Sequence, residues 1–223
     1  MRDILEVAAL CLGFLSWATV GISLQDQYWK ESTTDGSVIT TSTIYGNLWM
    51  SCASDSTGIY NCHDFQSLLA LPGYIQACRA FMIAAIVLGT FGITSTLFGM
   101  QCSKVGGDNY TFKGRIVTLG GLCFLLQGLS TIVGVSWYAF NITQEFFDPL
   151  YPGIKYEIGN GLYIGWSSAL LALCGGFLLL WACNLGTSEN IITLPSQPLT
   201  RSHKIGRSQS QSTCSQYEMN AYV

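Results

Sequence analysis

The sequence predicts an α-helical membrane protein with four spans. Two observations support this: the chain has few charged residues, and it contains four long apolar segments without charge. Of the 223 residues, 49% are hydrophobic and 10% are charged, whereas soluble domains carry about 25% charged residues. Four predominantly apolar segments lack Asp, Glu, Lys and Arg, and they are 19, 24, 29 and 31 residues long. Since about 20 apolar residues cross a bilayer as a helix, each segment is long enough for one span. The segments are 7–25, 80–103, 116–144 and 158–188.

Each charge-free segment is expected to contain one transmembrane helix in contact with membrane lipids. The alternative, a soluble domain, would have to bury four helices of this length in one small core. The first segment follows a single basic residue and lacks an A-x-A-like cleavage site, so we expect it to be retained as a signal anchor. The expected helices cover about 5–24, 80–101, 116–138 and 161–182.

The distribution of lysine and arginine predicts the orientation. With four spans, both termini lie on one side of the membrane. That side would hold seven Lys and Arg residues and the other side three, and such an excess marks the cytoplasm. The outer loops are then about 25–79 and about 139–160, with eight acidic and three basic residues. Such a surface attracts cations and repels anions.

The cysteines agree with this topology. Cys52 and Cys62 lie in the first outer loop, in an oxidising space where disulfides persist. We expect them to be bonded, which contributes roughly 3 kcal/mol in the chain-entropy model. Cys102 and Cys183 lie where the second and fourth helices leave the membrane on the inner side. S-palmitoylation is expected there, with a free thiol as the alternative. Cys78 has no evident partner.

The first outer loop has the composition of β-structure. A DG turn separates the segments 28–33 and 37–45, which are rich in Thr, Val and Ile, and this is a hairpin signal. The segments 47–52 and 59–62 can supply two further strands. The segment 62–71 has apolar residues at the spacing of a short amphipathic helix lying along the outer membrane surface.

Two tryptophans and two cysteines in this loop have a specific spacing. The pattern is a Trp, then Asn-Leu-Trp, two residues, a Cys, nine residues, a second Cys and a closing Arg. In the long first loop of a four-span chain it resembles the signature of the claudin family of tight-junction proteins. The resemblance covers the whole chain, although many members have Gly where Asn stands here. The matching residues are Trp29, Asn47, Leu48, Trp49, Cys52, Cys62 and Arg79.

The resemblance implies a fold: a left-handed four-transmembrane-helix bundle with a small extracellular antiparallel β-sheet. Four strands would come from the first loop and one from the second. Gly89, Gly92, Gly120 and Gly121 would allow the helices to approach closely. Some members have a bending proline in the third helix where this chain has Gly134, which implies a straighter helix.

The resemblance also implies two kinds of assembly, side by side in one membrane (cis) and across adjoining cells (trans), with the same or other claudins. In cis, Leu68 would dock against a neighbour's pocket made by Phe146, Phe147 and Ile158. An exposed apolar pair such as the two phenylalanines usually marks an interface, and burial against the protein's own helices is the alternative. The segment FFDPLY resembles the turn used in trans, with Asp148 where Asn is common.

Asp55 is the candidate selectivity residue for permeating monovalent cations such as sodium. An acidic residue at the matching position lines the path in claudins that form cation pores, and rings of carboxylates select cations. At ~4 Å a carboxylate attracts a monovalent cation by about 1 kcal/mol in water and about 4 kcal/mol at an effective dielectric of 20. Asp64 is a secondary candidate, and Glu145 and Glu157 are weaker ones. The alternative for each acid is a solvated surface charge.

The C-terminal region differs from the rest. From 187 to 223 the chain is rich in Ser and Gln and lacks helical or strand periodicity, so we expect a disordered cytoplasmic tail. Its last residues, Ala221-Tyr222-Val223, fit a PDZ groove through strand addition and carboxylate capture. With the family resemblance, the implied partners are scaffolds of the zonula occludens type.

Several function classes are disfavoured. The two histidines, His63 and His203, would lie on opposite sides of the membrane, and neither a nucleophile–base pair nor metal-ligand spacing occurs. We therefore expect no enzyme, cofactor, bound metal or nucleic-acid partner. Two alternatives stay open: a barrier-forming claudin without a pore, and an accessory subunit related to channel gamma subunits, which share part of the signature. The short second loop, the acidic position 55 and the NAYV ending favour a claudin.

Overall fold

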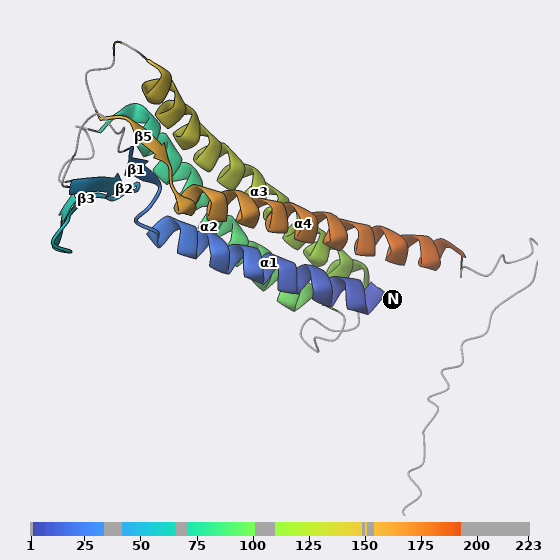
Figure 1. The fold of residues 1–223 in the computed structure, drawn as a ribbon. Coiled ribbons are helices and arrows are strands. Elements are labelled where there is room, and N and C mark those ends of the chain that lie inside the picture. Colours follow the sequence, from blue (N-terminus) through green and yellow to red (C-terminus); the bar gives the residue numbers. More distant parts are fainter. Residues whose placement is uncertain are drawn as a thin grey trace, which may run out of the picture. The chain divides into compact units, whose positions relative to one another are not determined.

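Four long helices form a bundle in the computed structural model, which describes residues 2–33, 42–65, 71–100, 110–148, 150 and 154–192. All four are long and apolar enough to cross a membrane, as the charge-free segments predicted. Figure 1 shows them running side by side. The helices are α1 (Arg2–Gln25), α2 (Gly73–Gly99), α3 (Tyr110–Phe147) and α4 (Asn160–Ile192).

Most helix ends lie beyond the spans expected from hydropathy, although α2 ends at Gly99, before the expected 101. Helix α4 continues to Ile192, so the expected disordered tail is wrong over 187–192.

Helix α3 extends on the side of the second outer loop. It continues past residue 138 to Phe147. The extension keeps a helical spacing of core residues, because Tyr138 and Ile142 are 1% and 3% exposed and stand four residues apart. The helix ends just before Asp148, the residue that precedes a proline and is therefore disfavoured in helical conformation.

Glycines allow the helices to approach closely, as predicted. A Cβ added at Gly92 would lie 2.9 Å from the Phe124 ring, and one at Gly89 would lie 2.7 Å from Gln127 Oε1. The same close approach holds at Gly120 and Gly121. Helix α3 passes through position 134 without a break.

A polar contact joins three helices inside the bundle. Ser16 of α1 donates its hydroxyl to the carbonyl oxygen of Ser168 in α4 at 2.8 Å, and Gln127 Nε2 of α3 donates to Ser16 Oγ at 3.1 Å. All three side chains are fully buried, and Gln127 Oε1 accepts no hydrogen bond within the described part of the chain. Such contacts between transmembrane helices are worth about 0.6 kcal/mol on average.

A five-stranded antiparallel sheet lies at the end of the bundle where α1 ends and α2 begins (Figure 1). Its order is β4-β3-β2-β1-β5. Four strands come from the first outer loop and one from the second, as the family resemblance implied. The strands are β1 (Lys30–Ser32), β2 (Ser42–Gly46), β3 (Met50–Asp55), β4 (Tyr60–Asp64) and β5 (Tyr156–Ile158).

The expected amphipathic helix over 62–71 is wrong at its start. Residues 62–64 belong to β4, because Cys62 and His63 pair with Cys52 and Ser51 of β3. Residues 66–70, including Leu68, lie outside the described residues.

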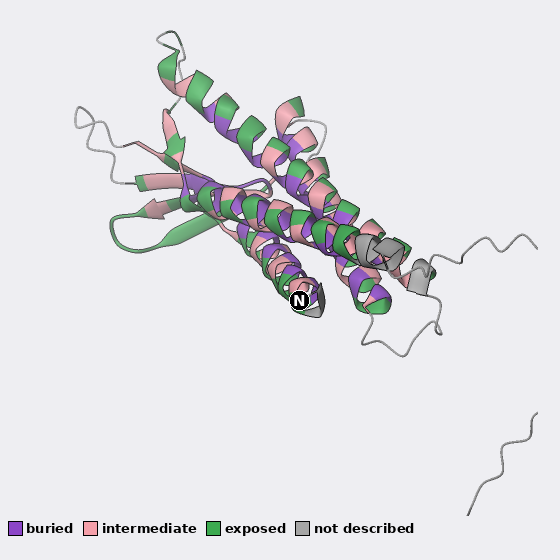
Figure 2. Ribbon diagram, turned by 90° about the vertical axis from the view of Figure 1, so that its right-hand side faces the viewer, coloured by how far each residue is buried: buried purple, intermediate pink, exposed green. Residues whose placement is uncertain are grey.

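The sheet and the bundle share one core. Trp29 and Leu48 from the first loop are fully buried in the same cluster as Tyr138, Met82 and Leu162 of the helices. In Figure 2 the buried residues line the inside of the bundle and exposed residues cover its outer surface. That outer surface is apolar, as a lipid-facing surface must be. Its exposed side chains include Phe14, Phe91, Leu129 and Phe177.

Candidate functional site: the outer sheet and its acidic residues

Trp29 fixes the sheet on the helices. It lies one residue before β1 and is fully buried. Its indole N–H donates to the carbonyl oxygen of Ser23 at 2.6 Å, and its ring meets Tyr138 of α3 edge-on at 5.2 Å. The first signature residue therefore connects the end of α1, the start of β1 and α3.

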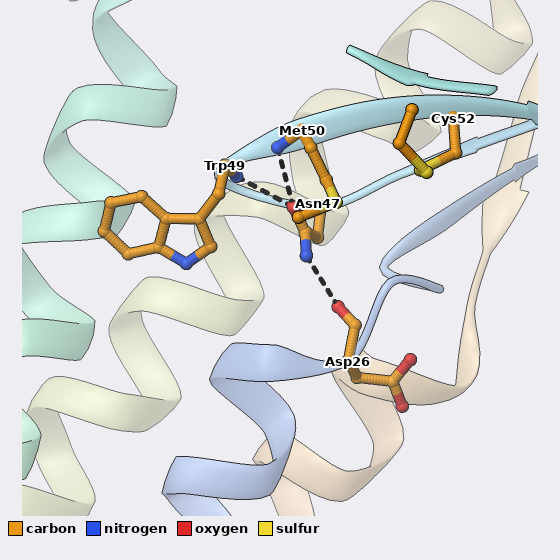
Figure 3. Close-up of a disulfide and its surroundings, with 6 residues drawn as sticks. Asp26, Asn47, Trp49, Met50 and Cys52 are labelled. Atoms are coloured by element: carbon orange, nitrogen blue, oxygen red, sulfur yellow. Dashed lines mark hydrogen bonds between the residues drawn. A yellow bond between two sulfur atoms is a disulfide. The ribbon is translucent and has the colours of Figure 1, made fainter. Parts of the chain in front are cut away.

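Asn47 closes the connection between β2 and β3. Its side-chain oxygen accepts hydrogen bonds from the backbone N–H groups of Trp49 and Met50 at 2.8 and 2.9 Å. Its amide nitrogen donates to the carbonyl oxygen of Asp26 at 3.0 Å, just after α1 (Figure 3). A glycine at this position has no side chain to make these bonds, so the departure from the common family residue adds three contacts.

Arg79 joins the sheet to α2. Its Nε donates to the carbonyl oxygen of Leu48 at 2.7 Å. Its guanidinium lies over the ring of Trp49, 4.8 Å from the centroid, and 5.9 Å from that of Phe65. Arg79 is 7% exposed, so its guanidinium contacts the backbone and rings of the first loop and contributes little to the charge of the surface.

The expected disulfide is present between Cys52 and Cys62. The two residues stand directly opposite each other on β3 and β4. Cys52 is buried, whereas every residue of β4 is exposed. The bond therefore holds an exposed edge strand to the rest of the sheet.

Asp55 is exposed at the end of β3, three residues after the disulfide. The turn that follows is well bonded: the Asp55 N–H donates to the Ile59 carbonyl, and the Gly58 N–H donates to the Asp55 carbonyl, both at 2.9 Å. The Ser56 N–H donates to Asp55 Oδ1 at 2.7 Å. Gly58 has a φ of 79°, a conformation that glycine adopts without strain. The carboxylate is thus held at the tip of a braced hairpin.

The strand register separates the acidic residues into two groups. Directly opposite residues share a face of a sheet, and successive residues alternate between faces. Lys30 stands opposite Gly46, which stands opposite Ser51, so Lys30 lies on the same face as Asp55. We call this surface the Asp55 face.

Glu157 and Asp64 lie on the other face, which we call the Glu157 face. Glu157 is directly opposite Glu31, and Glu31 is opposite Tyr45. Cys62 is part of the same row across β3, and Asp64 follows it by two residues. The described residues of one chain therefore do not gather the four candidate acids at one point.

Glu31 is a neighbour of Glu157 that the sequence did not indicate. Both side chains are exposed, and like charges directly opposite each other destabilise a sheet. The pairing joins β1 of the first loop to β5 of the second, so no local pattern could have found it. Glu145, the fourth candidate, is half-buried near the end of α3, where its charge acts on Lys30.

The residues predicted for the cis pocket lie together. An open groove of about 340 Å³ is lined by residues of α3, β5 and α4. Phe147 is 75% exposed, and Phe146 and Ile158 are half-buried. The two phenylalanine rings meet edge-on at 5.4 Å. The lining residues are Ile142, Thr143, Phe146, Phe147, Tyr156, Glu157, Ile158 and Tyr163.

The remaining predicted sites are only partly described. Cys183 is half-buried near the inner end of α4, and Cys78 is fully buried in α2. Cys102 and the terminal Ala221-Tyr222-Val223 lie outside the described residues. In the part of the chain that the structure describes, no group of three or more His, Cys, Asp and Glu side chains is placed to hold a metal ion.

Comparison with known proteins decides the family. Residues 4–179 match the family model for PMP-22/EMP/MP20/Claudin proteins. The chain is 42% identical to Claudin-15 of Rattus norvegicus over 227 residues, covering 100% of both. The chain belongs to the claudin family. It is also 44% identical to Claudin-10 of Bos taurus over 226 residues, covering 98% of this chain and 97% of the relative. A third relative is Claudin-19 of Rattus norvegicus, 43% identical over 193 residues and 86% of each chain.

Membership of the claudin family establishes the broad role. Claudins are structural proteins of the tight junction that span the plasma membrane several times, assemble with other claudins and are not enzymes. The four apolar helices and the disulfide-closed sheet agree with this role. The channel gamma subunit alternative loses its support, since the chain belongs to the claudin family and matches Claudin-15 of Rattus norvegicus over its whole length.

Proposed function

We propose that this claudin polymerises between adjacent cells and forms a cation-selective paracellular channel, in which Asp55 is the principal selectivity residue. The observation that carries the proposal is that Asp55 is exposed and lies in a turn held by hydrogen bonds. Its carboxylate is accessible, and the turn around it is braced by three hydrogen bonds from or to Asp55.

A braced carboxylate suits selection by charge. Aspartate is negatively charged at neutral pH, and a preorganised group need not reorganise when a cation passes. Several protomers that present Asp55 toward one narrow path would form a ring of negative charge. The attraction of about 1 to 4 kcal/mol expected at ~4 Å is enough to favour cations and too weak to trap them.

The other candidate acids contribute less. Asp64 and Glu157 lie on the opposite face of the sheet from Asp55, so they add to a negative field rather than to the Asp55 ring. Asp64 lies opposite Met50, roughly 17 Å along the strands from Asp55, and Glu157 lies three strands away, roughly 14 Å. Since both separations exceed the Debye length of about 8 Å at physiological ionic strength, their effect on a cation at Asp55 is screened.

Assembly is proposed to follow the family pattern. In cis, Leu68 of one protomer docks in the groove of its neighbour that contains Phe146, Phe147 and Ile158. In trans, the second outer loop makes contact with the adjoining cell. On the inner side, Ala221-Tyr222-Val223 binds PDZ scaffolds of the zonula occludens type, and Cys102 and Cys183 carry palmitoyl groups.

The test is the ratio of sodium to chloride permeability in an epithelial layer that expresses the chain. Wild type should raise this ratio, Asp55→Asn should lower it, and Asp55→Lys should reverse the preference toward anions. Asp148→Asn, which removes another exposed acid outside the sheet, is the charge-matched control and should have a smaller effect.

Equal junctional protein and strand formation must be verified for each variant. If strands form but dilution potentials are the same for wild type and Asp55→Lys, Asp55 is not the selectivity residue. If wild type raises resistance to both ions equally, the protein is a barrier-forming claudin.

A further inference from the structure

The five strands of the sheet carry a single lysine or arginine. Their described residues include four acids, Glu31, Asp55, Asp64 and Glu157, and one basic residue, Lys30. Lys30 lies on the Asp55 face. An exposed ammonium on that face would repel the cations that the channel is proposed to conduct.

The Lys30 side chain does not extend freely from the sheet. Its Nζ lies over the ring of Tyr156 in β5, 4.4 Å from the centroid. Its Cε crosses Gly46 of β2, where an added Cβ would lie 3.4 Å from it. Lys30 is half-buried as a result.

Glu145 supplies the compensating charge. It belongs to the extension of α3 beyond the predicted span. Burial lowers the pKa of Lys30, and the negative charge of Glu145 opposes that change. The ammonium therefore lies against an aromatic face, which attracts cations, and it is within reach of the negative charge of Glu145.

We propose that the Tyr156 ring is a cradle for the Lys30 ammonium and, with the charge of Glu145 offsetting it, withdraws the charge of Lys30 from the cation path. This inference rests on the proposed cation channel and changes one of its parts. Glu145 acts through Lys30, whose charge it partly offsets, and it does not line the path. Tyr156 holds the ammonium in place.

Releasing Lys30 should reduce cation preference measurably. Without salt screening, an ammonium about 10 Å from a passing cation in water changes the local cation concentration about twofold, and the change is smaller at physiological ionic strength. In a bath of low ionic strength, Glu145→Gln and Tyr156→Leu should therefore each lower the sodium-to-chloride permeability ratio by up to about twofold. Tyr156→Phe keeps the aromatic ring, so it should lower the ratio less than Tyr156→Leu does.

The decisive experiment is a double-mutant cycle in the full-length protein expressed in an epithelial layer. Lys30→Met alone should give a ratio at or above that of wild type, because the charge to be withdrawn is gone. In the Lys30→Met background, Glu145→Gln should change the ratio by much less than twofold. If Glu145→Gln lowers the ratio equally in both backgrounds, Glu145 lines the path and the cradle is refuted.

Two further arms separate the possible failures. Asp55→Asn tests the channel itself: if it leaves the ratio unchanged, the proposed function fails whatever Lys30 does. If Asp55→Asn lowers the ratio but Glu145→Gln does not, only the cradle fails. Since Glu145→Gln is nearly isosteric, it keeps the test available even if Tyr156→Leu does not reach the junction.

Discussion

The bundle and the sheet differ in which side chains they expose, because lipid is expected to surround the bundle and water the sheet. The bundle exposes apolar side chains such as Phe91 and Phe177 and buries polar ones such as Ser16 and Gln127. The sheet exposes acids such as Asp55 and relies on a disulfide to hold its exposed edge strand. In lipid, backbone hydrogen bonds must be made inside each helix, whereas a small sheet in water needs cross-links and anchors. The signature residues are those anchors.

The largest effect should come from breaking the junction between the two regions. Trp29→Ala removes a fully buried ring and its contacts with Ser23 and Tyr138. Replacing a buried Trp by Ala costs about 3–5 kcal/mol, so the midpoint of thermal unfolding of the detergent-purified protein should fall markedly.

Trp29→Phe, which keeps an aromatic ring but loses the N–H donor, is the matched control. Its midpoint of thermal unfolding should fall less than that of Trp29→Ala. A variant Trp29→Ala that unfolds at the wild-type temperature would show that the sheet and the bundle are independent.

A smaller effect, confined to the sheet, should follow from Cys52→Ser. Removing the disulfide costs roughly 3 kcal/mol in the chain-entropy model, and it releases the exposed strand β4. Amide hydrogen exchange should increase in β3 and β4 and stay unchanged in the four helices. Cys11→Ser, at an exposed position in α1, is the control. Equal loss of protection in the helices would contradict the separation of the two regions.

The smallest effect should come from the polar contact inside the bundle. Gln127→Leu removes the hydrogen bond to Ser16 and also an oxygen that accepts none among the described residues. The two changes oppose each other, so the free energy of unfolding should change by less than about 1 kcal/mol. Unfolding in mixed detergent measures it. A loss of several kcal/mol would mean that the bundle depends on this contact as the sheet depends on its disulfide.

The sequence predicted the bundle well because each transmembrane helix can be recognised from one continuous segment of the chain. A span has to be long and uncharged, and segments such as 80–103 and 116–144 show this directly. The disulfide was also predictable, since both cysteines lie in one loop of known compartment. The family signature predicted which residues matter, although the bonds of Asn47 to Asp26 and to the turn were visible only in the structure.

The candidate site was less predictable because it depends on pairings between distant segments. Glu31 meets Glu157 and Lys30 meets Tyr156 only after β1 has paired with β5, more than 100 residues away. The faces of Asp55 and Asp64 depend on the register of β3 and β4. A shift of β4 by one residue would have placed Asp64 on the Asp55 face, and no local pattern fixes that register.

The continuation of α3 to Phe147 is a helical extension beyond the expected span, on the side of the second outer loop. From residue 138 to Phe147 the helix rises by about 14 Å at 1.5 Å per residue. The second outer loop therefore starts at a set height above the expected span, and under the proposed trans contact this height contributes to the spacing between two apposed membranes. Deleting one helical turn from the extension would bring the loop about 5.4 Å closer to its own membrane. The proposed trans contact then makes the width of the intercellular gap depend partly on helix length.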